Sequence, residues 1–137
     1  MTAPKLDVSE TTARGQRLMD TLEPGMSARV GGRLGELDPG LERLVTDYAF
    51  GEVLSRPGLD IKTREMLTVA ALTALANAPG QLELHMRAAL NVGVTRAELL
   101  EIVIQMAVYA GLPACMNGIT AYRAALAAVD KRKQVVD

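Results

Sequence analysis

Apolar residues recur three or four positions apart along most of the chain, a spacing typical of helices that each bury one face. No stretch alternates apolar and polar residues in the way of a half-buried strand. Glycine and proline divide the pattern into segments of ordinary helix length. The sequence therefore predicts an all-α fold of about six or seven helices. The expected helices span about residues 11–22, 39–53, 61–76, 81–91, 95–110 and 114–130.

The first part of the chain, residues 1–37, is expected to be the less regular one. Residues 11–22 form a modest helix candidate, and residues 27–35 contain three glycines, which leaves loop and weak helix both open. Asp38 followed by Pro39 has the form of a helix N-cap with proline at the first helical position. The residues that follow place one apolar stripe at helical spacing, formed by Leu41, Leu44, Val45 and Tyr48.

The second half carries clearer helix boundaries. Asp60 is expected to cap a helix over 61–76 that is apolar on nearly every face and so should be the central, most buried one. Gly93 suits a left-handed residue after the next helix. Thr95 and Glu98 have the spacing of a capping box.

The composition fits one helical domain over residues 1–137, because 49% of the residues are apolar while only 3% are aromatic. A formal net charge of −1 argues against a nucleic-acid partner. The longest apolar stretch, residues 66–76, is too short to cross a membrane, and residues 1–10 lack the apolar core of a secretory signal. We therefore expect a cytoplasmic protein without a membrane partner.

Few side chains in the sequence could perform catalysis. The single Cys115 excludes an internal disulfide and is expected to pack near the start of the last helix, and a single histidine anchors no convincing metal site. No phosphate-binding glycine loop and no Gly-x-Ser-x-Gly motif is present, which leaves proton transfer and electrostatics.

His85 is the candidate for proton transfer, since imidazole is the side chain that titrates nearest neutral pH. It shares a helix face with Leu82, Met86 and Ala89, whereas Glu83 and Arg87 are spaced to pair on the other side. The residues alone leave a purely structural role for His85 open.

Three stretches of the sequence resemble the carboxymuconolactone decarboxylase family, and together they span about residues 48–125. The first holds Arg56-Pro57-Gly58-Leu59, Thr63-Arg64 and Leu67-Thr68-Val69-Ala70. The second is Glu83-Leu84-His85-Met86-Arg87-Ala88-Ala89-Leu90-Asn91 with Gly93-Val94-Thr95. The third is Ala107-Val108-Tyr109-Ala110-Gly111-Leu112-Pro113-Ala114. Their order and spacing carry the resemblance.

The resemblance implies the helical fold of the alkylhydroperoxidase D proteins, which assemble as trimers or hexamers. The peroxidase branch uses a Glu, a Cys-x-x-Cys pair and a His four residues after the second Cys. Ala78 and Gln81 stand at the two cysteine positions here, so thiol-dependent peroxidase activity is expected to be absent. Glu65 falls at the position of the Glu if the turn around 78–80 carries one extra residue.

The decarboxylase branch implies a lyase of aromatic catabolism, in the β-ketoadipate pathway, that needs no metal, flavin or nucleotide. In that interpretation CO2 leaves a carboxylated lactone, His85 protonates the enolate, and Glu65 holds the imidazole tautomer. Arg56, Arg64 and Arg87 are then candidates to bind the substrate carboxylate, with surface salt bridges as the alternative.

The sequence departs from the family at one point. Its decarboxylases usually carry a further His before the first motif, and residues 25–30 contain none. Arg29 is a fourth candidate to bind the substrate through its charge, but it transfers no proton near pH 7. This departure concerns the substrate more than the fold. Two alternatives therefore stay open: a paralogue that acts on a different small lactone or carbonyl acid, and a non-catalytic oligomeric protein that binds a small molecule.

Overall fold

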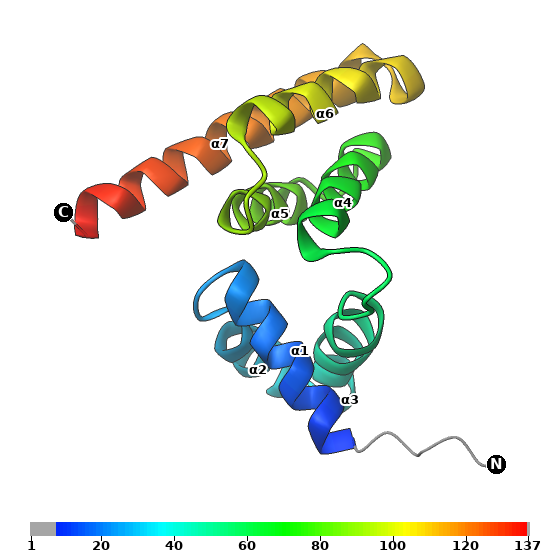
Figure 1. The fold of residues 1–137 in the computed structure, drawn as a ribbon, viewed down its shortest axis with the longest axis vertical. Helices are drawn as coiled ribbons and strands as arrows, with labels where there is room; N and C mark the ends of the chain where they lie inside the picture. The colour runs from blue at the N-terminus through cyan, green and yellow to red at the C-terminus, as the bar shows by residue number, and fades with distance from the viewer. Residues whose placement is uncertain (1–7, 137) are drawn as a thin grey trace. The chain divides into compact units, whose positions relative to one another are not determined.

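The computed structural model describes residues 8–136, and these residues confirm the predicted all-α fold (Figure 1). They form seven α-helices and one π-helix, with no strand among them. The chain divides into two compact units, Met1–Leu59 and Asp60–Asp137. Unit 1 holds α1 (Val8–Leu22), α2 (Met26–Gly35), α3 (Pro39–Arg43) and the π-helix η1 (Leu44–Val53). Unit 2 holds α4 (Ile61–Leu75), α5 (Pro79–Asn91), α6 (Arg96–Ala110) and α7 (Leu112–Val136).

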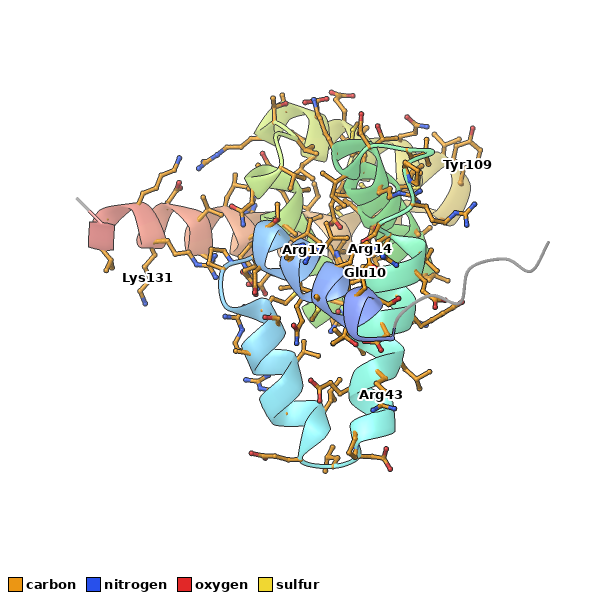
Figure 2. All side chains as sticks on the ribbon, turned by 60° about the horizontal axis from the view of Figure 1, so that its bottom comes forward. Glu10, Arg14, Arg17, Arg43, Tyr109 and Lys131 are labelled. Atoms are coloured by element: carbon orange, nitrogen blue, oxygen red, sulfur yellow. The ribbon has the colours of Figure 1, made fainter. Side chains whose placement is uncertain are left out.

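In unit 1, α1 packs closely against η1 because glycines lie where the two helices meet. A Cβ added at Gly15 would lie 2.0 Å from the carbonyl oxygen of Thr46, and one added at Gly51 would lie 2.6 Å from that of Thr11. Arg14 of α1 reinforces the contact, since its Nε donates to the carbonyl oxygen of Gly51 at 2.8 Å (Figure 2).

The N-terminal part of the chain is more regular than the sequence indicated. Residues 27–35, for which loop and weak helix were both open, lie in the α-helix α2, which follows Gly25 at a φ of 80°. Asp38 caps α3 as predicted, with its side chain accepting from the backbone N–H of Gly40 at 2.6 Å. The single α-helix expected over 39–53 is α-helical only to Arg43 and continues from Leu44 as a π-helix. The apolar stripe is too short to distinguish the wider spacing of a π-helix from that of an α-helix.

In unit 2, α5 and α6 pack against α7, and α4 contacts the other three helices. The predicted caps are confirmed: Asp60 caps α4 by accepting from the Thr63 N–H at 2.7 Å, and Thr95 with Glu98 forms a reciprocal capping box on α6. The helix expected from about residue 81 starts earlier, at Pro79, because proline fits the first turn of a helix. Gly93 has a φ of 102° after α5. The last helix starts at Leu112 and runs beyond Asp130, so it is longer than expected at both ends.

The expectation that the helix over 61–76 is the most buried one is wrong for this chain. Buried positions on α4 are Glu65, Val69 and Thr73, which lie four residues apart on one face. Leu67 and Leu75 remain 54% and 64% exposed on the rest of its surface. More positions are buried on α5, which lies against both α4 and α7. An apolar helix is therefore covered here only where neighbouring helices reach it.

Candidate functional site

The two catalytic candidates of the sequence lie in contact inside unit 2. His85 on α5 is 8% exposed, and Glu65 on α4 is fully buried. The Nδ1 of His85 lies 2.9 Å from Oε2 of Glu65. The contact follows from helical spacing, because Glu65 shares the buried face of α4 with Val69, and His85 shares that of α5 with Leu82.

This contact defines what the imidazole can do. When Nδ1–H of His85 donates to the carboxylate, Nε2 is the ring nitrogen that remains able to exchange a proton with a ligand. Oε1 of Glu65 is buried and has no hydrogen-bond partner among residues 8–136. His85 is thus the hydrogen-bonding partner that the structure gives this carboxylate, which makes each side chain depend on the other for its burial.

Two of the four candidate arginines belong to the same unit as this pair. Arg87 forms the predicted ion pair on α5, with its Nη1 2.9 Å from Oε1 of Glu83. Arg87 follows His85 by two residues and so points roughly 200° away around the helix axis. Arg64 directly precedes Glu65 on α4 and is half-buried.

The other two candidate arginines belong to unit 1. Arg29 is held there by local contacts: its Nη2 lies 3.0 Å from Oε2 of Glu23, and its Nη1 donates to the carbonyl oxygen of Pro24 at 3.1 Å. Glu23 is only 1% exposed, so Arg29 balances a buried carboxylate. Arg56 is exposed in the turn that follows η1.

A cavity of about 350 Å³ lies in unit 2 at the end of α4, the start of α5 and the middle of α7. Ala78, one of the two positions where the peroxidase branch carries a cysteine, lies in its wall. Leu82 also lines it, but His85, one helical turn further along α5, does not. The lining residues are Leu72, Thr73, Ala76, Ala78, Pro79, Gly80, Leu82, Glu83, Asn117, Thr120, Ala121 and Ala124.

Sequence reasoning missed two polar residues that the structure brings forward. Asn117 enters the cavity wall from α7, and Glu23 is the buried partner of Arg29. Ala121 and Ala124 on α7 were a usable signal for the cavity, because small residues three positions apart lie on one helix face and leave space beside it. No such signal marks Glu23.

Cys115 is 9% exposed and belongs to the core of unit 2, which confirms its predicted packing role.

The described residues contain no cluster of three or more His, Cys, Asp or Glu side chains that could hold a metal ion. None of the helices within residues 8–136 has the length and apolar character needed to cross a membrane.

These features define an all-helical protein with a buried Glu–His pair on adjacent helices. The chain belongs to the carboxymuconolactone decarboxylase family, whose sequence model matches residues 39–131. The match confirms the resemblance recognised in the sequence motifs.

Three relatives illustrate what the chain is similar to. It is 42% identical over 81 residues to the 4-carboxymuconolactone decarboxylase of Acinetobacter baylyi, covering 59% of this chain and 60% of that protein. It is 44% identical over 81 residues to the nitrosuccinic acid decarboxylase of Metarhizium robertsii, covering 59% and 55%. An uncharacterized 15.0 kDa protein of Paracoccus denitrificans is 33% identical over 106 residues, covering 77% and 79%. The chain thus matches less than two thirds of the length of either decarboxylase.

Proposed function

We propose that this protein is a carboxy-lyase without a cofactor, which removes CO2 from a small carboxylated molecule and uses His85 to protonate the resulting carbanion. The observation that carries the proposal is the buried 2.9 Å contact between His85 Nδ1 and Glu65 Oε2. It fixes the ring and directs Nε2 as the proton-transferring atom. The similarity to two decarboxylases gives the reaction class.

The reaction needs one bond cleavage and one proton. The bond between the substrate carbon and its carboxylate breaks, CO2 leaves, and the electron pair delocalises into a neighbouring acceptor such as a lactone carbonyl. His85 then delivers the Nε2 proton to that carbon, and solvent returns a proton to the ring. Glu65 acts as a positioning residue, because its carboxylate holds Nδ1–H and stabilises the imidazolium.

The substrate is proposed to be 4-carboxymuconolactone or a close analogue in which an electron-withdrawing group lies next to the departing carboxylate. Of the four arginines, Arg64 is our candidate to bind a second carboxylate, since it precedes Glu65 on α4. Arg56, Arg87 and Arg29 are the other candidates for that contact.

The test is to measure CO2 release from 4-carboxymuconolactone and from nitrosuccinic acid. We expect His85→Asn and His85→Gln to lower kcat by about two to four orders of magnitude. Gln81→Asn, an exposed change on the same helix, serves as the control and should keep the wild-type rate. Glu65→Gln should lower kcat more than it raises KM and should move the pH–rate profile, which a merely structural residue would not do. Folded His85 variants with wild-type turnover would refute the proposal.

We also propose that the protein is a homo-oligomer, a trimer or a hexamer of two trimers. In unit 2 the end of α6 and the start of α7 expose an uncharged apolar surface. Tyr109, which Figure 2 labels, belongs to it, and its exposed fraction is 78%. Residues 102–122 contain no Asp, Glu, Lys or Arg. Such a surface is typical of an interface between identical chains. Its large side chains are Ile104, Val108, Tyr109, Leu112 and Met116.

Light scattering at micromolar concentration tests the oligomer. Val108→Asp should shift the protein toward monomer, whereas Val135→Asp, at an equally exposed position near the end of α7, should not. A monomeric wild-type protein would contradict the proposal.

A further inference from the structure

The cavity of unit 2 has a chemistry that differs from that of the His85–Glu65 pair. Its walls are mostly methyl and methylene groups from alanine, leucine and proline side chains. Lys, Arg and His are absent from the residues that line it, and Glu83, already paired with Arg87, is its ionisable group. A carboxylate placed inside would lose hydration and meet no cationic side chain. The lining therefore favours an uncharged ligand.

The polar groups of the wall differ in what they can still bind. The hydroxyl of Thr73 donates to the Val69 carbonyl oxygen at 2.7 Å, and that of Thr120 donates to the Met116 carbonyl oxygen at 3.3 Å. The side-chain amide of Asn117 makes no hydrogen bond within residues 8–136, so it keeps both a donor and an acceptor for a ligand. Asn117 is thus the polar recognition group of the cavity.

The volume limits the size of the ligand. A cavity of about 150 Å³ accommodates benzene, and the one in unit 2 measures about 350 Å³. It is therefore suited to a molecule of one or two rings, at the small end of the range of ligand pockets. Small side chains create this space. Ala76, Ala121 and Ala124 each leave empty the volume that a leucine at the same position would fill.

We propose that this cavity is a binding site for an uncharged, compact molecule of one or two rings, whose polar atom hydrogen-bonds to the amide of Asn117. The site is separate from the His85–Glu65 pair, because neither of those side chains lines it. It also goes beyond the proposed lyase activity, since the proposed substrate carries a carboxylate and this ligand does not.

The experiment compares two probes that share a ring system. Coumarin is a neutral two-ring lactone, and coumarin-3-carboxylate adds one negative charge to it. Binding of each to the full chain is measured by NMR titration or calorimetry. We expect a coumarin Kd of roughly 0.1–1 mM and an affinity for the carboxylate that is at least about tenfold lower.

Substitutions then locate the site. Ala124→Leu fills the cavity and should weaken coumarin binding at least about tenfold. Its matched control is Ala127→Leu, the same change at an exposed position of α7 outside the lining, which should alter the Kd by less than about twofold. Asn117→Leu removes the hydrogen-bonding amide at an exposed position and should weaken binding by about two- to tenfold. Circular dichroism melts confirm that each variant is folded.

Several outcomes would overturn the proposal. Equal affinity for the two probes would show that the cavity does not select against charge. Equal losses in Ala124→Leu and Ala127→Leu would place coumarin elsewhere. Absence of coumarin binding, together with a change of oligomeric state in Ala124→Leu, would show instead that the cavity receives a second copy of the chain.

Discussion

Replacing Glu65 by alanine is the sharpest test of the buried pair. The substitution removes the hydrogen-bond acceptor 2.9 Å from His85 Nδ1 and leaves a ring that is 8% exposed without its partner. Breaking one side of a buried pair costs about 3–5 kcal/mol, because the remaining polar group stays desolvated. Domains of this size are stable by about 5–15 kcal/mol, so the loss is a large fraction of the total.

The measurement is urea unfolding followed by circular dichroism, with thermal melts in parallel. A loss of this size should lower Tm by roughly 10 °C or more. In a double-mutant cycle, Glu65→Ala and His85→Ala should be less than additive, with a coupling of about 1–3 kcal/mol.

The control is Glu83→Ala on α5, which removes a carboxylate that is 35% exposed and paired with Arg87. This pair is only partly exposed, and its loss should still cost less than that of the buried pair, roughly 1 kcal/mol. If Glu65→Ala costs no more than Glu83→Ala, or if the cycle shows no coupling, the buried pair is not formed in solution and the proposed role of His85 loses its structural basis.

Three further predictions concern the rest of the chain. Hydrogen bonds from the backbone N–H and the side chain of Thr63 lower the pKa of Asp60 below its ordinary value. The contribution of this carboxylate to stability is therefore present above the ordinary pKa and is lost as the pH falls through the lowered one, so between pH 2 and 6 the Tm of Asp60→Asn should vary less than that of the wild type. Gly15→Ala should destabilise unit 1 by more than about 2 kcal/mol, because its Cβ would collide with backbone, whereas Gly32→Ala, which meets nothing within 4 Å, should stabilise α2 by about 0.4–1 kcal/mol in urea unfolding. The protein should not reduce an organic hydroperoxide with a dithiol donor, and Cys115→Ser should keep any lyase activity. Robust peroxide turnover would contradict the inference that the protein, without the paired cysteines, has no thiol-dependent peroxidase activity.

Helix boundaries in unit 2 could be predicted because their causes are local. The capping side chains accept hydrogen bonds from backbone N–H groups within three residues, as Asp60, Thr95 and Glu98 show. Gly93 adopts a positive φ because glycine has no Cβ to clash with the backbone. The π-helical period of η1 could not be predicted, because it accompanies the close contact with Gly15 of α1, far away in the sequence.

Burial was harder to predict than helix position, as α4 shows. Its apolar residues surround the helix, so periodicity does not distinguish the face toward α5 and α7 from the exposed face that carries Leu67 and Leu75. Glu65, a charged residue, is more buried than either leucine because His85 supplies its partner. A hydropathy pattern assigns such a carboxylate to the surface, and only the family resemblance pointed to it.

The candidate site and the cavity illustrate two different limits of sequence reasoning. His85 was recognisable because imidazole chemistry belongs to one residue and the motif around it is specific. The cavity is harder to recognise in the sequence, because it arises from volume that small side chains leave unfilled. Neither Ala76 nor Ala124 indicates a cavity by itself; the space forms only where α4 and α7 meet at the start of α5. Because α5 contributes Leu82 to the cavity and His85 to the buried pair one turn later, a substitution of Leu82 should disturb both, whereas one of Ala124 should disturb the cavity alone. That difference makes Ala124 the better position for separating ligand binding from proton transfer.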